Sequence, residues 1–229
     1  MVGHAGWALR ARGLAVHPGD GRAAGGEGVK YLGTLEELHA LYGVPGAAST
    51  RKEAPRVTPE YRRIIEAAPF LALATVGPEG ADCSPRGDAP GQLVRILDER
   101  TLALPDRRGN DRIDSLRNII RDPRVALMFL IPGSGNALRI NGTARITADA
   151  PLCESFRMEG RLPRSIAILT IETIYFQCAR ALIRAKLWEP YAVPDLPTPG
   201  QILAAMTAGE VGGARYDAAW PERAKTSMR

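Results

Sequence analysis

Cationic and polar side chains gather between positions 107 and 115, where their types and spacing suit the binding of an anion. The stretch contains three arginines and two short polar residues: Arg107, Arg108, Asn110, Arg112 and Ser115. A helix is predicted over residues 111–121, and the free N–H groups at a helix start attract a phosphate. The alternative is a solvated basic loop before an ordinary capped helix, and composition alone leaves both open.

Arg86 provides a second candidate anion contact, in the sequence Ser84-Pro85-Arg86-Gly87-Asp88. An arginine can bind a phosphate through two parallel hydrogen bonds, and a glycine lets the backbone approach a flat ligand closely. The alternative is a structural bulge or turn between two strands. The sequence is equally compatible with both.

Histidine, cysteine and metal chemistry are not expected in the body of the chain. The only histidines lie before position 40: His4, His17 and His39. The cysteines Cys83, Cys153 and Cys178 are far apart and odd in number, so we predict buried free thiols rather than disulfides or a metal site. We assign no catalytic acid, base or nucleophile. Such a chain imports its reactive group or carries out no chemistry.

The length and composition are those of an ordinary globular protein. The chain has 229 residues, of which 45% are hydrophobic and 24% charged, and a net charge of +5. Its basic residues are spread out and not interleaved with aromatics, so nucleic-acid binding is not expected. No apolar stretch approaches the roughly 20 residues of a membrane helix, and the first residues lack a signal-peptide core. We therefore expect a cytoplasmic protein that binds neither nucleic acid nor membrane.

The elements around the 107–115 stretch are predicted from hydrophobic spacing and proline positions. A strand over 101–104 ends at Pro105, which has no N–H group for a ladder. Asn110 is a candidate N-cap for the helix, and Asp122-Pro123 ends it. Its predicted buried stripe is Ile113, Leu116 and Ile120. The apolar run 125–131 predicts a strand that is covered on both faces.

Two helices are predicted before the first strand. A capping box at Thr34 and Glu37 begins a helix that ends at Gly43. Thr58-Pro59 begins the other helix, and residues 47–57 between the two are predicted to be a polar linker. The second helix directs three side chains inward: Tyr61, Ile64 and Ile65. Two later helices are predicted over 151–158 and 201–207.

The remaining pattern is that of a mainly β (α+β) protein. Predicted strands cover residues 70–76, 81–84, 92–97, 101–104, 125–131, 138–147 and 165–177, with pairing interrupted at 85–91. Short strands with tight turns and only small helices favour a barrel or a sandwich. We divide the chain into a flexible tail (1–29), N-terminal helices (30–68), a barrel (69–190) and a C-terminal extension (191–229).

The central sequence resembles a known family. The string PDRRGNDRIDSLRNIIRDPRVALMFLIPG, preceded by DCSPRGDAPG and followed by LRINGTARIT, resembles the pyridoxamine 5'-phosphate oxidase-like flavoproteins. These belong to the FMN-binding split-barrel superfamily, and the likeness is greatest to their bacterial flavin-nucleotide-binding branch. It covers residues 69–190. The resemblance implies an FMN-binding split β-barrel with small flanking helices, which forms a homodimer with FMN in the cleft between subunits. It implies no particular substrate.

The resemblance also implies cofactor contacts. In the family, the strand corresponding to Ser84, Arg86 and Gly87 lies along the isoalloxazine ring and contributes a basic phosphate contact. A second block of contacts falls on Pro105, Asp106, Arg108, Asn110, Arg112 and Ser115. The family's adjacent Arg-Lys pair is replaced here by Asp114-Ser115. Phosphate binding is therefore expected from Arg108, Arg112 and the helix start.

Two further groups of residues have both a functional and a structural interpretation. Arg139 and Asn141 share one face of a strand, where Arg139 either contacts the flavin edge or joins a cross-strand polar ladder. In the family, the segment matching Arg184, Lys186 and Trp188 reaches the flavin of the opposite subunit. The alternative is a set of surface side chains around a packed tryptophan. A late histidine of the oxidases is missing here, which leaves open whether pyridoxamine phosphate is oxidised.

The leading hypothesis is an FMN-dependent oxidoreductase that acts on an unassigned small molecule by hydride transfer through flavin N5. A non-enzymatic flavin or haem binding or storage protein is one alternative. A deazaflavin-dependent reductase on the same fold is another. The visible spectrum of the bound cofactor distinguishes the three.

Overall fold

The computed structural model describes residues 28–227, which fall into two compact units, the first ending at residue 52 and the second beginning at residue 53. The two units are described separately. The predicted flexible tail, residues 1–29, lies almost wholly outside the described residues.

The first unit contains two short helices, α1 (Leu35–Tyr42) and α2 (Ala47–Thr50). The predicted capping box of α1 is confirmed, because Thr34 Oγ1 accepts a hydrogen bond from the Glu37 N–H at 3.2 Å and the Glu37 carboxylate accepts one from the Thr34 N–H. The prediction of a polar linker over residues 47–57 is wrong in part. This stretch contains the helix α2. It also contains Ala54, which belongs to the second unit and forms an antiparallel backbone bridge with Ile174.

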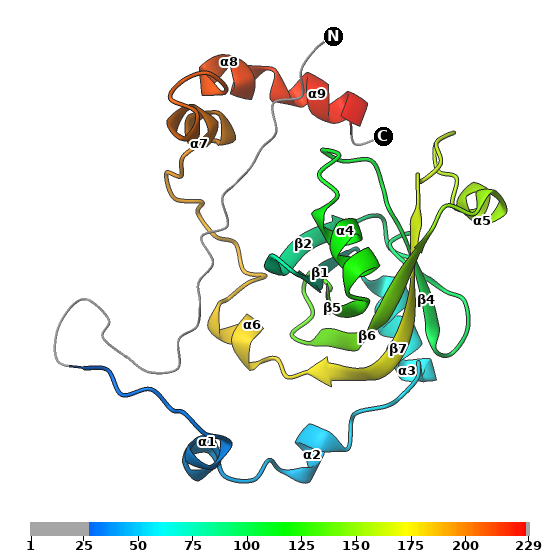
Figure 1. Cartoon of the computed structure of the whole chain (residues 1–229), viewed down its shortest axis with the longest axis vertical. Coiled ribbons are helices and arrows are strands. Elements are labelled where there is room, and N and C mark those ends of the chain that lie inside the picture. The colour runs from blue at the N-terminus through cyan, green and yellow to red at the C-terminus, as the bar shows by residue number, and fades with distance from the viewer. Residues whose placement is uncertain (1–27, 228–229) are drawn as a thin grey trace. The chain divides into compact units, whose positions relative to one another are not determined.

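The second unit is built on one antiparallel sheet of seven strands in the order β2-β1-β5-β6-β7-β4-β3 (Figure 1). The strands are β1 (Phe70–Gly77), β2 (Gly80–Gly87), β3 (Arg95–Ile96), β4 (Thr101–Pro105), β5 (Arg124–Leu130), β6 (Ala137–Thr147) and β7 (Ile166–Gln177). The sheet bends strongly, and β2 and β3 are its two edges. These observations confirm the predicted α+β class with a mainly β core.

One face of the sheet is the hydrophobic core. Along β5, Val125, Leu127 and Phe129 are buried, whereas Met128 on the other face is 41% exposed. Within one chain, the strand is therefore not covered on both faces as predicted. An apolar run does not by itself distinguish a fully enclosed strand from one whose outer face is open.

The β1–β2 hairpin is longer than predicted. Residues 85–87 continue β2, with Arg86 opposite Leu71 and Gly87 opposite Phe70, so the predicted interruption of pairing at residue 85 is wrong. Pro85 is tolerated because β2 is an edge strand, where a missing N–H group leaves no partner unsatisfied.

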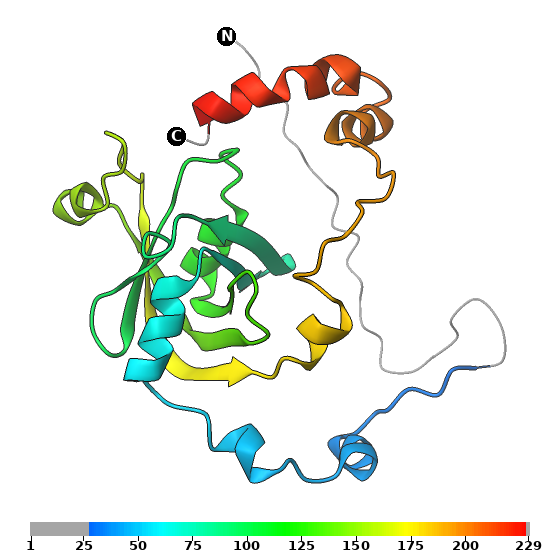
Figure 2. The ribbon, with the colours of Figure 1, turned by 180° about the vertical axis from the view of Figure 1, so that it is seen from behind.

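Helix α3 (Pro59–Ala67) packs on the core on the side seen in Figure 2. Thr58 caps it by accepting a hydrogen bond from the Tyr61 N–H at 3.3 Å. Tyr61 and Ile65 are buried, and Ile64 packs against the core, as predicted.

The later helices begin with α4, which follows β4, and extend to the end of the described residues. They are α4 (Asp114–Arg121), α5 (Ala150–Ser155), α6 (Arg180–Arg184), α7 (Pro199–Met206), α8 (Gly213–Ala218) and α9 (Trp220–Ser227). The sequence did not predict α8 and α9. Asp217 of α8 holds the start of α7, because its carboxylate accepts hydrogen bonds from Thr198 Oγ1 at 2.6 Å and the Gly200 N–H at 2.8 Å. Hydrogen bonds between two helices produce no repeating hydrophobic pattern in the sequence, so they could not be used to predict α8.

The buried face of α4 differs from the predicted one. Ile113 and Ile120 are 43% and 75% exposed, and the buried residues are Ser115, Asn118 and Ile119. Asn110 is not the N-cap, since the helix begins at Asp114 after Ile113. The predicted apolar stripe is therefore wrong, and α4 turns a face of two polar residues and one isoleucine toward the sheet.

The prediction of three buried thiols is confirmed only for Cys153. Cys83 and Cys178 are exposed, and none of the three cysteines forms a disulfide bond within residues 28–227. Cys83 lies on the edge strand β2, whose side chains alternate between the two faces, so a cysteine there need not be buried.

Candidate functional site

A cleft of ≈ 1110 Å³ lies between β2, the end of β4, the loop into α4 and the segment between α5 and β7. Nine of the thirteen residues predicted to contact a cofactor line it: Ser84, Arg86, Gly87, Pro105, Asp106, Arg108, Asn110, Arg112 and Ser115. Sequence reasoning placed these residues in two separate blocks. The antiparallel sheet brings the two blocks to one place.

The segment 158–165, which leads into β7, forms a wall that the sequence analysis did not predict. It contributes apolar and cationic side chains: Met158, Arg161, Leu162, Pro163 and Arg164. Arg164 bonds to Asp111 at 2.9 Å, which joins this segment to the loop before α4. In the sequence, this segment shows only that it precedes the predicted strand 165–177. That this strand pairs with β4, which brings the segment to the cleft, is seen only in the structure.

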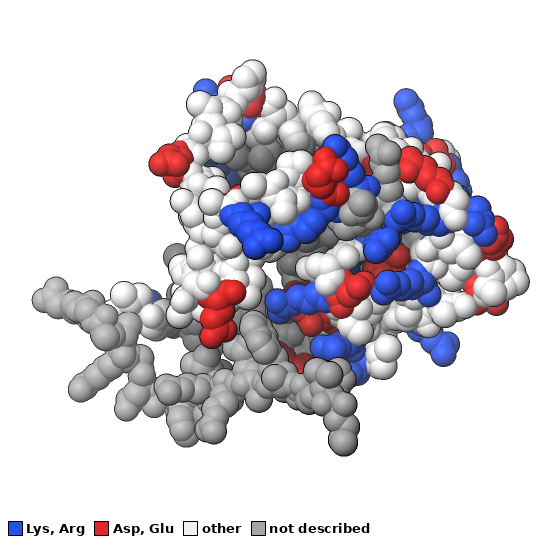
Figure 3. Space-filling view, turned by 90° about the horizontal axis from the view of Figure 1, so that it is seen from above, with Lys and Arg blue, Asp and Glu red and all other residues white. Residues whose placement is uncertain are grey.

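Several charged side chains of the cleft are paired with one another. Arg107 bonds to Asp88 at 2.9 Å and to the Phe156 carbonyl at 2.9 Å, so it ties the loop after β4 to β2 and to the end of α5. Arg112 pairs with Asp114, the first residue of α4. This carboxylate raises the pKa of Arg112, and Asp82 raises it further. Figure 3 shows basic and acidic side chains interspersed on one face of the molecule.

Ser115 is 4% exposed and its hydroxyl is engaged in two hydrogen bonds. It donates to Asp82 at 2.9 Å, and it lies 2.8 Å from the Ser84 hydroxyl. Since the single Ser115 proton is directed to Asp82, Ser84 is the donor of the second bond. The first turn of α4 is thereby fixed to β2 within the cleft wall.

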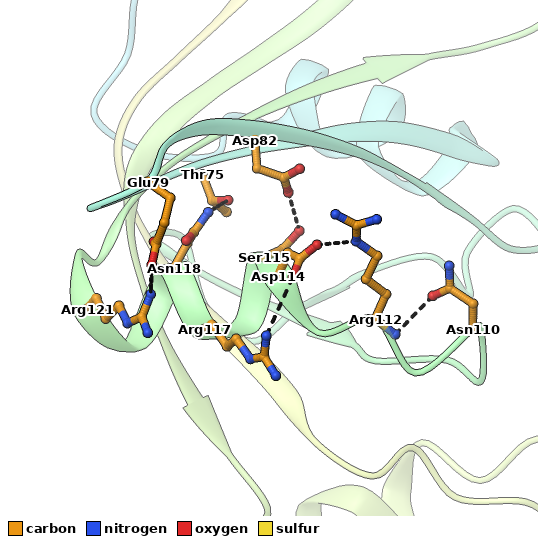
Figure 4. A network of polar contacts seen from close by, with 10 residues as sticks. All are labelled: Thr75, Glu79, Asp82, Asn110, Arg112, Asp114, Ser115, Arg117, Asn118 and Arg121. Carbon is orange, nitrogen blue, oxygen red and sulfur yellow. Dashed lines mark hydrogen bonds and ion pairs between the residues drawn. The ribbon is translucent and has the colours of Figure 1, made fainter. Parts of the chain in front are cut away.

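Two further turns of α4 continue this attachment (Figure 4). Asn118 donates to Thr75 Oγ1 at 3.1 Å, with both side chains buried, and Arg121 bonds to both carboxylate oxygens of Glu79 at 2.9 Å. Ser115, Asn118 and Arg121 lie three residues apart, on one side of the helix. We call these three residues and their partners on the β1–β2 hairpin the α4 seam. Because α4 leads directly out of the cleft loop, the α4 seam sets the position of that loop.

Asp106 is a half-buried carboxyl at the end of β4, and its side chain makes no hydrogen bond or ion pair with residues 28–227. Burial raises its pKa above the ordinary value of 3.8. The guanidinium groups of Arg86 and Arg164 oppose this effect, and Asp111 reinforces it.

The raised pKa predicts a pH-dependent effect of Asp106→Asn. A carboxyl that holds its proton more tightly in the folded state costs stability as the pH rises from its unfolded pKa through its folded one. Asparagine removes this cost. The variant should therefore melt above the wild type at neutral pH, and the difference should vanish at about pH 3, below both pKa values. Thermal melts of both proteins across this range test the prediction, which a constant difference would contradict.

The other four predicted contacts lie outside the cleft. Arg139 is on the outer face of β6 with its guanidinium 5.2 Å from the Tyr175 ring centre, and Asn141 bonds to Thr173 at 3.4 Å. Both pairs are direct cross-strand neighbours, so the polar ladder is present. Three residues follow β7: Arg184, Lys186 and Trp188. The Trp188 indole donates to the Ser134 carbonyl at 2.7 Å, and Lys186 lies 3.6 Å from Glu189.

A sequence model of the pyridoxamine 5'-phosphate oxidase family matches residues 57–178, just over half of the chain. The chain therefore belongs to this family. The matched region begins just before α3 and ends after β7, so it contains the whole sheet and the walls of the cleft. No curated protein matches the chain.

Several solved structures resemble part of the chain. HupZ from Group A Streptococcus is 20% identical, with 52% of this chain and 91% of that one covered and a TM-score of 0.42. A Clostridium acetobutylicum protein related to general stress protein 26, of the pyridoxinephosphate oxidase family, is 16% identical over 52% and 86%, with a TM-score of 0.40. An F420 reductase is 20% identical over 53% and 98%, with a TM-score of 0.38.

The described part of the chain, residues 28–227, contains neither a membrane-spanning helix nor a metal cluster. None of the helices there has the length and hydropathy of a membrane span. In the same residues, no three or more His, Cys, Asp or Glu side chains are grouped so that they could hold a metal ion.

Proposed function

We propose that the protein is a flavin-dependent oxidoreductase that binds FMN in the cleft and acts on a small molecule. The observation that carries the proposal is the convergence of the two blocks of predicted contacts, one on β2 and one between β4 and α4, on a single cleft. The family membership supports it, because residues 57–178 supply both blocks.

The residues of the cleft fit such a cofactor. Its volume slightly exceeds the roughly 300–1,000 Å³ typical of small-molecule sites. Apolar side chains that could contact a flat ring come from separate segments of the chain: Leu93, Leu104, Leu116, Met158 and Leu162. Cationic and amide donors suited to a phosphate group lie on the same lining, among them Arg86, Arg108 and Asn110.

Each part of the chain would have a distinct role. When bound, FMN would supply hydride transfer through its N5 atom. The strand β2 would lie along the ring, since Gly87 has no side chain to hold a ligand away. Arginines of the cleft would bind the phosphate. The apolar walls would exclude water, and the α4 seam would hold the loop in place. No side chain is assigned as an acid or base.

We also propose that the protein is a cytoplasmic homodimer. On the outer face of the sheet, Phe70 and Met128 are 36% and 41% exposed, and Arg139 is directly opposite Met128. A second copy would cover this apolar face. Arg184, Lys186 and Trp188 would then reach the cleft of the partner, and Arg139 would face the interface.

The spectrum and mass of the molecule that co-purifies with the protein test the proposed cofactor. Oxidised flavin absorption with the mass of FMN is the expected result, and a haem or a deazaflavin spectrum would contradict it. Oxidation of NADH or NADPH by the loaded protein then distinguishes an enzyme from a binding or storage protein. Light scattering tests the dimer, which a flavin-loaded monomer would contradict.

A further inference from the structure

We propose that Asp106 carries a proton of the reaction, binding it when the cofactor in the cleft is reduced and releasing it when hydride passes to the ligand. The inference rests on the proposed function and deepens it, because that function includes hydride transfer but assigns no group to the accompanying proton. It concerns one side chain of the cleft rather than the way in which the cofactor is held.

The side chains that line the cleft leave few candidates for such a group. Among the described residues, the lining contains no histidine, cysteine, glutamate, lysine or tyrosine, so its titratable side chains are aspartates and arginines. An arginine does not give up its proton in a protein. The proton-carrying group is therefore one of the five aspartates of the lining.

Four of these aspartates already have a side-chain partner. The pairs are Asp82 with Ser115, Asp88 with Arg107, Asp111 with Arg164, and Asp114 with Arg112. Asp106 is the exception, since its carboxyl makes no hydrogen bond or ion pair with residues 28–227. Both of its carboxyl oxygens can therefore exchange a proton with a molecule in the cleft without breaking a contact of the protein.

The backbone holds Asp106 at the edge of the hydrophobic core. Strand β4 ends at Pro105, and the N–H group of Asp106 continues the contact with the β7 side by donating to the Ser165 carbonyl at 2.9 Å. Side chains alternate along a strand, so Asp106 follows Leu104, which belongs to the core and also lines the cleft. The carboxyl is thus half-buried beside apolar side chains, where burial disfavours its charged form.

Three charged groups act on the Asp106 carboxyl from the surrounding elements. Burial raises its pKa above 3.8, the guanidinium groups of Arg86 on β2 and Arg164 before β7 oppose this effect, and Asp111 in the loop before α4 reinforces it. A carboxyl in such a balance responds to any further charge nearby. Negative charge gained by a cofactor in the same cleft raises its affinity for a proton again.

The protons and electrons of the two steps balance. Reduction by NADH or NADPH oxidises the nicotinamide and adds a hydride to the flavin, so the charge of the cofactor falls by one. The Asp106 carboxylate binds a proton from water, which leaves the total charge in the cleft unchanged. When a ligand with a C=O or C=N bond is reduced, hydride forms a new C–H bond and the Asp106 proton passes to the oxygen or nitrogen. The double bond becomes a single bond, and the carboxylate is restored.

The midpoint potential of the FMN-loaded, full-length protein, measured between about pH 4 and pH 8, tests the inference. Each proton bound on reduction changes the reduction equilibrium tenfold per pH unit, which is about 30 mV for a two-electron couple. Over part of this range, the slope of the wild type should exceed that of Asp106→Asn by this amount. The infrared difference spectrum between reduced and oxidised protein should also gain the C=O band of a protonated carboxyl in the wild type but not in Asp106→Asn.

Asp111→Asn is the matched control. It removes another aspartate of the same charge from the lining, and asparagine tolerates the positive φ of 57° at this position. Because Asp106 is retained, the steeper slope and the carboxyl band should both persist in this variant.

Equal slopes in the wild type and Asp106→Asn would overturn the inference, and so would loss of the carboxyl band in Asp111→Asn. If Asp106→Asn does not bind FMN, the infrared band decides: its presence in both the wild type and Asp111→Asn supports the inference, and its absence from the wild type overturns it. A wild type that binds no flavin would instead overturn the proposed function, and its absorption spectrum shows this before any potential is measured.

Discussion

Gly142→Ala is expected to be the most destabilising single-methyl substitution in the sheet. A Cβ at this position would lie 2.0 Å from the Thr170 carbonyl oxygen and 3.1 Å from its carbon, distances that side chains do not reach. The obstacle is backbone of the neighbouring strand, so it cannot turn away as a flexible side chain could. The residue lies at the register shift between β6 and β7, where Asn141 is opposite Thr173 but Gly142 is opposite Ile171.

The expected loss of stability follows from the need to move strands β6 and β7 apart around the added methyl group. Strands β6 and β7 form the longest pairing of the sheet, and separating them locally would also disturb the core residues Ile140 and Ile171. We expect a loss of about 3–5 kcal/mol in the free energy of unfolding, against a usual total of about 5–15 kcal/mol. The melting temperature should fall by about 10 °C.

Denaturant titration and thermal melts of Gly142→Ala measure the effect, and Gly109→Ala is the control. A Cβ at Gly109 would meet no atom within 4 Å, so this variant should stay within about 1 kcal/mol of the wild type. Equal midpoints for the two variants would show that the β6–β7 pairing can relax around the added methyl group.

The parts of the fold that the sequence predicted correctly depend on neighbours along the chain. The capping box at Thr34 and the N-cap at Thr58 are complete within four residues, and the alternation of β6 follows from the pleat of a strand. The β1–β2 hairpin was found for the same reason, because its turn is short. Its far end was misjudged at Pro85, since an edge strand tolerates a proline and the sequence does not show which strand is at the edge.

The candidate site was predicted where its residues are close in sequence and missed where the chain returns from a distance. The blocks around Arg86 and Arg108 each contain several polar residues in a row, so they could be recognised. The wall over 158–165 and the pairing of Arg164 with Asp111 depend on β7 lying beside β4. No local pattern encodes that contact.

The largest error, the face of α4, has a physical cause that leads to the last prediction. Hydrophobic spacing favoured Ile113, Leu116 and Ile120, but a helix can be held to a sheet by hydrogen bonds when their partners are buried with them. Asn118 donates to Thr75 at 3.1 Å, and its Oδ1 occupies the space that a side chain at position 77 would need, only 2.2 Å from an ideal Cβ on Gly77. The size of the Asn118 side chain and its hydrogen bond to Thr75 therefore both hold α4 at the same position along β1.

We expect Asn118→Ala to destabilise the protein by about 2–3 kcal/mol, because it leaves the Thr75 hydroxyl buried without its donor and opens a cavity beside Gly77. Thr75→Val should cost about 1–3 kcal/mol, because the Asn118 amide then loses its acceptor. The double variant should cost less than the sum of the two by about 1 kcal/mol, as expected for residues in direct contact.

Ile120→Ala distinguishes the observed arrangement of α4 from the predicted apolar stripe. At 75% exposure Ile120 should tolerate the change within about 0.5 kcal/mol, whereas a core isoleucine would lose about 2–5 kcal/mol. Denaturant unfolding of the four variants gives all the required differences. A large loss for Ile120→Ala together with a small one for Asn118→Ala would mean that α4 is rotated toward its apolar face in solution, and the α4 seam would then not be what holds the cleft loop.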